Sequence, residues 1–332
     1  KKSASKMLLL LKLLSLAYVT GGFVISSRLG RHHHAAKIAS STAAFSSAVI
    51  EPPTWEELEK LAPQKESKAT SKLTLFRDTN GWCPFCERVW AALEVKGIPY
   101  DEVTVSLQNK PQWYKNLVPS KLVPAVELHD CASFQVGVPG SSERGLVAES
   151  ADILKLLDDE FPDTVRLSTG SDVELKAVAS VEALLSSSFK YSYSVRNASL
   201  SLDDKAQRKA EFLSCLDDVE ALFSSGGGGG GPFLAGDAVS VADLMAIPML
   251  ERYRYQLRFL AGADAPDLYA SYPGLAAWFD AMDATEGFSR RVAGDAYSWT
   301  AVTSTFLRLF AKDSTPPEVL AAADAAAEAL LL

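Results

Sequence analysis

The feature that most constrains the fold is a strand, a turn, a helix and a second strand in quick succession. Residues 73–77 are rich in strand-forming side chains, and residues 78–81 favour a turn. Residues 84–96 place apolar side chains at helical spacing and stop at Gly97, a common helix terminator. A second strand is predicted at residues 100–105. Two strands joined by a helix predict a parallel βαβ unit with the helix packed on one face of a sheet.

The rest of the chain divides into a part with strand signals and a part without them. Two more strands are predicted at 125–129 and 146–148, followed by a helix at 150–160. Beyond residue 171 the apolar spacing is helical, which predicts helices at 172–197, 203–224, 240–260, 273–285, 298–311 and 316–331. We therefore predict an α/β plus all-α protein, with a thioredoxin-like domain at 71–162, an all-helical domain at 171–311 and a C-terminal helix at 312–332.

The first 50 residues have the composition of a targeting leader. Seven of the 33 basic residues and none of the 41 acidic residues lie in positions 1–45. An apolar run from Met7 to Val19 follows the first lysines, as in a signal sequence, and the basic stretch rich in Ser and Ala after it is typical of a transit peptide. We expect a bipartite leader at 1–50, a linker at 51–70 and delivery to a plastid. A retained membrane anchor, an endomembrane lumen and the cytoplasm are the alternatives.

The remainder of the chain is acidic and poor in histidine. The net charge is −8 although the leader is basic, so the body would repel a phosphate backbone, and we expect no binding to nucleic acid. Three of the four histidines, at positions 32–34, lie in the leader, which leaves only His129 in the body. Chemistry that needs a histidine base or several histidine ligands therefore has little material here.

The strongest chemical signal is the sequence Cys83-Pro-Phe-Cys86 between the first strand and the helix. A cysteine at a helix start meets unpaired backbone N–H groups and the positive helix end, which favour the thiolate without any histidine. Cys86 lies one helical turn further on, where it can resolve a mixed disulfide or simply pack in the core. Pro84 suits the first helical turn.

Three other interpretations of the two cysteines remain open. They form half of a zinc site if His129 and Cys131 complete a Cys₃His set, although these two follow the third strand rather than the helix start. They form a structural disulfide if the compartment is oxidising. They are buried, inert core residues in the third interpretation, although Cys83 follows a turn signal. We predict no metal site, and interpret Cys131 and Cys215 as ordinary thiols.

Four segments resemble the cysteine-containing glutathione transferases of the omega, lambda and dehydroascorbate reductase classes. They are WCPFCERVWAALEVKGIPY at 82–100, KPQWYKNLVPSKLVPAVEL at 110–128, ESADILKLLDDEFP at 149–162 and FLAGDAVSVADLMAIPMLER at 233–252. The segments occur in the family's order and cover both predicted domains. The resemblance implies the glutathione transferase fold and glutathione as cosubstrate.

The resemblance also implies roles for particular residues. Cys83 matches the catalytic cysteine that forms a mixed disulfide with glutathione. Val123–Pro124 matches the cis-proline turn, whose first residue pairs through its backbone with the cysteinyl part of glutathione. Glu149–Ser150 matches the acid and hydroxyl that hold the γ-glutamyl end, and Phe85 and Lys121 are assigned to the glutathione site as well.

These features predict a glutathione-dependent thiol transferase or reductase that carries out deglutathionylation or dehydroascorbate-type reduction. It acts through a Cys83 mixed disulfide, which Cys86 or a second glutathione resolves. The second substrate would be a small molecule or a protein thiol, and the protein a monomer or homodimer, at a membrane only if the leader is retained. The alternative is a non-catalytic binding or assembly protein with the same fold. Leu122 favours the alternative, because the family usually has Lys or Gln at that position.

Overall fold

The computed structural model describes residues 70–79, 83–129, 145–197, 199–224, 230–261 and 265–288, together with residues 317 and 321. The predicted leader, nearly all of the linker, Cys131 and the predicted helix at 298–311 lie outside the described residues. So does most of the predicted C-terminal helix. Among the described residues, no helix is long and apolar enough to cross a lipid bilayer.

The N-terminal half forms a four-stranded mixed sheet, as the sequence predicts. Its strands are β1 (Leu73–Asp78), β2 (Tyr100–Val105), β3 (Ala125–Leu128) and β4 (Leu146–Ala148), in the order β2-β1-β3-β4. β1 and β2 are parallel and linked by α3 (Pro84–Lys96), while β3 pairs antiparallel with both β1 and β4. The predicted βαβ unit is therefore confirmed, and α3 ends at Gly97, whose φ of 64° suits a residue without a side chain.

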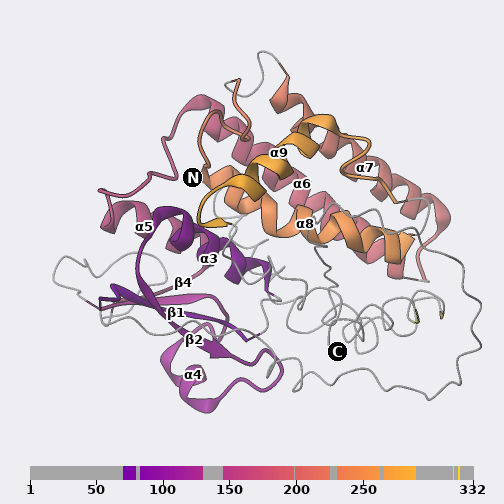
Figure 1. Cartoon of the computed structure of the whole chain (residues 1–332). Coiled ribbons are helices and arrows are strands. Elements are labelled where there is room, and N and C mark those ends of the chain that lie inside the picture. The colour runs from indigo at the N-terminus through magenta and orange to yellow at the C-terminus, as the bar shows by residue number, and fades with distance from the viewer. Residues whose placement is uncertain are drawn as a thin grey trace, which may run out of the picture.

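Helices cover both faces of the sheet (Figure 1). α3 and α5 (Ser150–Glu160) lie on the face that meets the helical domain, and the short helix α4 (Gln112–Leu117) lies on the other. The alternation of side chains along a strand explains this arrangement. Leu75 belongs to the large core shared with α3 and α5, whereas its neighbour Phe76 packs with Tyr114 of α4.

The C-terminal half is helical. It consists of α6 (Asp172–Arg196), α7 (Leu202–Glu220) with the 3₁₀ turn Ala221–Phe223, α8 (Val241–Ala261) and α9 (Pro273–Ala284). α6 and α7 begin at Ser171 and Ser201, whose side chains accept hydrogen bonds from backbone N–H groups of the first turn. These helices match the predicted helices to within a few residues at each end, and the described residues of this half form no strand.

A buried carboxylate, Asp243, fixes the start of α8 against α9. It accepts hydrogen bonds from the backbone N–H groups of Leu234 and Ser240, at 2.9 and 2.8 Å, and from the Ser240 hydroxyl at 2.6 Å. The indole Nε1–H of Trp278 donates to the same carboxylate at 2.7 Å. Burial raises the pKa of Asp243, although these four donors favour the charged form.

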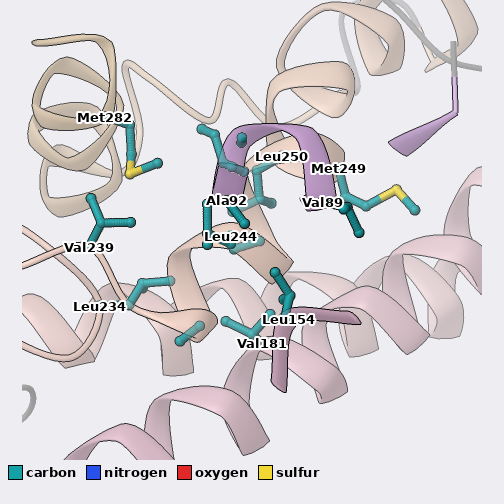
Figure 2. Packing of buried hydrophobic residues seen from close by; sticks show 14 of the residues in the cluster. Val89, Ala92, Leu154, Val181, Leu234, Val239, Leu244, Met249, Leu250 and Met282 are labelled. Carbon is teal, nitrogen blue, oxygen red and sulfur yellow. The ribbon is translucent and has the colours of Figure 1, made fainter. Parts of the chain in front are cut away.

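The larger of the two apolar clusters formed by the described residues runs through both halves of the molecule. Figure 2 shows α3 and α5 contributing to the same cluster as the helices of the C-terminal half, through Val89, Ala92, Leu154, Val181, Leu244, Leu250 and Met282. Within this core a buried ion pair joins Glu87 of α3 to Arg252 of α8. The helix that carries the two cysteines is therefore anchored to both domains.

Candidate functional site

Cys83 lies where β1 gives way to α3. It is the N-cap of α3, in extended conformation, and its carbonyl accepts the first helical hydrogen bond, from Glu87 N–H at 3.1 Å. Its side chain is almost fully buried. The thiol donates to the backbone oxygen of Val123 at a sulfur–oxygen distance of 3.9 Å. The predicted position of this cysteine at a helix start is confirmed, and its sulfur faces the Val123–Pro124 turn.

The Val123–Pro124 peptide bond is cis, as the resemblance predicts. The strand pairing places this turn beside the start of α5. Phe76 of β1 stands opposite Ala125 of β3, and Ala125 stands opposite Ala148 of β4. Pro124, which precedes β3, and Glu149, which follows β4, therefore lie at the same end of the sheet.

Ser150 is the first residue of α5, and it is buried. Its hydroxyl accepts a hydrogen bond from Arg88 Nη1 at 3.2 Å, while Arg88 Nη2 donates to the Met245 carbonyl of α8 at 3.3 Å. Burial lowers the pKa of Arg88 to about 10, which leaves the guanidinium charged at neutral pH. Glu149 precedes the helix with a φ of 80°. The pair thus lies at the positive end of a helix, a place that favours an anionic group.

Cys86 faces inward from the first turn of α3 and is buried. Burial, a hydrogen bond with Cys83 and the negative charges of Cys83 and Asp78 raise the pKa of the Cys86 thiol well above its usual value. Its sulfur, the Cys83 sulfur and a carboxylate oxygen of Asp78 all lie within 4.8 Å of one another. Cys86 is therefore a protonated thiol at neutral pH, although both cysteines are buried in the same apolar cluster.

Lys110 is a site residue that the sequence reasoning missed. Its ammonium group is half-buried, interacts electrostatically with both Cys83 and Cys86, and donates to the Lys121 carbonyl at 3.0 Å. Burial lowers the pKa of Lys110, and the charges of the two cysteines oppose that shift. The signal was present in the segment KPQWYKNL, where a lysine precedes a proline at a helix start. Such a lysine is not distinctive on its own.

Lys121 and Leu122 contribute their backbone carbonyl groups to the site, and neither provides a buried charged side chain. Lys121 has a φ of 57° and an exposed side chain. Its carbonyl accepts from Lys110, and the Leu122 carbonyl accepts from the Tyr114 hydroxyl at 2.5 Å. Two side chains thus fix the loop that leads to the cis turn.

Phe85 and the remaining candidates occupy other positions. The ring of Phe85 is partly buried, with the Arg88 guanidinium 5.4 Å from its centroid. His129 does not join the cysteines. Its ring bonds to the Ser71 carbonyl and the Thr74 hydroxyl, both at 2.8 Å, near the opposite end of β1 from Asp78. The Cys₃His arrangement is therefore wrong with respect to His129.

Two family models match the chain in the order of its domains. The model for the glutathione S-transferase N-terminal domain matches residues 82–160, and that for the C-terminal domain matches residues 203–281. Chloroplastic glutathione S-transferase L2 of Arabidopsis thaliana is 28% identical over 210 residues, which cover 62% of this chain and 62% of that protein. Glutathione S-transferase DHAR2 of the same plant is 27% identical over 194 residues, covering 58% of this chain and 78% of the relative.

A solved structure gives the same result for the fold. Glutathione transferase Omega 2C from Trametes versicolor superposes with a TM-score of 0.53 at 24% identity, covering 73% of this chain and 100% of that one. At this identity the structural match is evidence for the fold alone, whereas the two family models and the curated relatives match the amino-acid sequence. Both domains and their order agree, and the chain therefore contains the N- and C-terminal domains of a glutathione S-transferase, with relatives of the lambda, DHAR and omega types.

Proposed function

We propose that this protein is a glutathione-dependent thiol transferase or reductase in which Cys83 is the nucleophile. The observation that carries the proposal is the position of the Cys83 sulfur, at the start of α3 and 3.9 Å from the Val123 carbonyl. A thiolate there gains from the positive helix end and from the nearby ammonium group of Lys110. The family's named relatives, glutathione S-transferases, support the assignment of glutathione as cosubstrate.

Each part of glutathione has a proposed partner at this edge of the sheet. The Val123 backbone next to the cis bond would pair with the cysteinyl part. The γ-glutamyl carboxylate would lie at the start of α5, near Glu149 and Ser150. Lys110 would attract the glycine carboxylate, in place of Lys121, which the resemblance assigned to the glutathione site. The Phe85 ring, which already contacts Arg88, would border the same pocket.

The reaction we propose has two steps. The Cys83 thiolate attacks the glutathione sulfur of a mixed disulfide, the substrate thiolate leaves, and a Cys83–glutathione disulfide forms. The thiolate of a second glutathione then attacks that disulfide, releasing oxidised glutathione and the Cys83 thiolate. Because its pKa is raised, Cys86 contributes little thiolate at neutral pH, so the second glutathione is the main resolving thiol.

The test is turnover of a glutathionylated peptide, coupled to glutathione reductase, in matched cysteine variants. We expect Cys83→Ser to fall to the uncatalysed background, Cys86→Ser to keep most activity, and Cys215→Ser, on α7, to match the unmodified protein. Mass spectrometry after incubation with oxidised glutathione should locate the adduct on Cys83. An adduct confined to Cys131 or Cys215, or an active Cys83→Ser variant, would favour the non-catalytic alternative. Loss of activity in both Cys83→Ser and Cys86→Ser would indicate a dithiol mechanism.

We further propose that the protein acts in a plastid. The basic leader composition supports this location, and relatives such as the L2 and DHAR3 transferases of Arabidopsis thaliana are named chloroplastic. A fluorescent fusion to residues 1–50 should enter plastids, and the same fusion with the seven basic residues of this segment replaced by Gln should not. A fusion that stays in the endomembrane system or the cytoplasm would contradict this location.

A further inference from the structure

The described residues contain one group of three side chains with the chemistry of a metal site, and it includes both cysteines of the CPFC sequence. Asp78 ends β1, Cys83 caps α3, and Cys86 lies in the first turn of α3. Their ligand atoms all lie within 4.8 Å of one another. The side chains are 0%, 3% and 1% exposed, so no layer of bulk water separates them. From this geometry we infer, against the sequence prediction of no metal site, that Asp78, Cys83 and Cys86 form a binding site for a thiophilic divalent cation of the zinc type.

The distances suit a tetrahedral ion. With zinc–sulfur bonds of about 2.3 Å, two ligands of a tetrahedral ion stand about 3.8 Å apart. The three atoms therefore need to approach one another by at most about 1 Å, which side-chain rotation of two cysteines and one aspartate provides. Only three protein ligands are present among the described residues. The fourth position stays open for a water molecule or for the thiolate of glutathione.

The donor set selects the kind of ion. Two sulfurs and one carboxylate oxygen suit zinc and cadmium, whereas magnesium and calcium need six or more oxygen ligands. The ion binds both sulfurs as thiolates, so any proton on either sulfur passes to the solvent on binding. The two thiolates and the carboxylate then carry three negative charges. The ion and the nearby Lys110 ammonium carry three positive charges, so the buried cluster is neutral.

The site has a consequence for the reaction, and this consequence rests on the proposed function. Coordination draws electron density from the sulfur and holds it against the ion, so an occupied site makes Cys83 a much weaker nucleophile toward a disulfide. Micromolar zinc should inhibit turnover, and a chelator should restore it. Oxidation of Cys83 and Cys86 to a disulfide removes both sulfur ligands, so only the reduced protein binds the ion.

The test uses cobalt(II) as a spectroscopic probe, followed by displacement with zinc. The protein is the full chain, reduced, with His32, His33 and His34 replaced by Asn and with Cys131→Ser and Cys215→Ser, so that other potential ligands are removed. We expect one cobalt per chain, with visible bands of tetrahedral intensity and thiolate charge transfer. Cys86→Ser should halve the charge-transfer intensity per cobalt and weaken binding by at least about 100-fold. Asp78→Asn should keep the charge-transfer bands and weaken binding by about 10-fold or more.

Two outcomes would overturn the inference: an affinity unaffected by Cys86→Ser or Asp78→Asn in a folded protein, and the absence of cobalt binding by the reduced chain. If circular dichroism shows that Asp78→Asn does not fold, the chain with its Asp78 intact still provides a test. Oxidation to the Cys83–Cys86 disulfide must abolish the cobalt spectrum, and a spectrum that persists would refute the site. Cobalt binding is measured without glutathione, so a protein that binds cobalt but lacks transferase activity would refute only the proposed function.

Discussion

The ion pair between Glu87 and Arg252 gives the most direct test of how the two domains are held together. Both side chains are 1% exposed, and the pair joins α3, next to Cys86, to α8 of the helical domain. Replacing Glu87 by Gln keeps the shape of the side chain but removes its negative charge. The buried guanidinium of Arg252 then has no carboxylate partner at position 87. Removing one member of a buried pair costs about 3 to 5 kcal/mol.

This cost translates into a large change in melting temperature. A protein with some 150 to 250 ordered residues loses about 2 to 4 °C for each kcal/mol, so Glu87→Gln should lower the melting temperature by about 6 to 20 °C. The exposed pair between Lys155 and Asp159 on α5 is the matched control, since its side chains are 73% and 55% exposed. Lys155→Gln should cost less than about 0.5 kcal/mol.

The assay is urea unfolding followed by circular dichroism, with thermal melts as a second measurement. The double variant Glu87→Gln with Arg252→Met removes the charge at both ends, so it should recover part of the loss, because the isolated charge is what is costly. A difference of less than about 0.5 kcal/mol between the unfolding free energies of Glu87→Gln and Lys155→Gln would show that the buried pair contributes no more than an exposed one. A double variant less stable than Glu87→Gln by the full cost of a second buried deletion would show that the isolated charge is not what destabilises the single variant.

Three other results should follow from the site and the core. Iodoacetamide should alkylate Cys83 well before Cys86 at neutral pH, because the raised pKa of Cys86 leaves little thiolate until the pH is well above the pKa of an ordinary thiol. Equal alkylation rates in peptide mapping would contradict this. Lys110→Met should raise the KM for glutathione by about 10-fold or more. The effect should shrink as the pH rises through the lowered pKa of Lys110, because the lysine then loses its charge. A larger effect of Lys121→Met would show that Lys121, rather than Lys110, binds the glycine carboxylate. Asp243→Ala should cost at least about 3 kcal/mol in urea unfolding, since it leaves several buried N–H groups without an acceptor, and a loss below about 1 kcal/mol would show that water replaces the carboxylate.

Local patterns gave the secondary structure of both domains. The first predicted strand, 73–77, is one residue shorter than β1, and the predicted helix 84–96 has the bounds of α3, because Pro84 and Gly97 define both ends chemically. Helix α4 was not resolved from the sequence. Six residues span fewer than two helical turns, which is too short for a period of 3.6 to be recognised.

The sequence predicted the site residues that lie next to one another in the chain. It missed those that come close only when the chain folds. Cys83 and Cys86 belong to one short sequence, and their helix start was evident. Lys110 approaches them from a loop beyond β2, and Asp78 does so because β1 ends beside the first turn of α3. The direction of a buried side chain at a strand end depends on tertiary packing. No spacing rule in the sequence reports it.

The contacts of Arg88 bear on how members of this family can exchange domains during evolution or engineering. One nitrogen of its guanidinium holds the Ser150 hydroxyl, and another holds a backbone carbonyl of α8. Every residue type has a carbonyl, so position 245 is free to vary in side chain without loss of this contact. A one-residue insertion within the first turn of α8, between Val241 and Met245, is different, because it changes by about 100° the direction in which the carbonyl of residue 245 points relative to the start of the helix. Hybrid proteins made by joining domains of different origin should therefore keep the contact that holds Arg88 against Ser150 when the spacing from the start of α8 to position 245 is preserved, however much the sequence there differs.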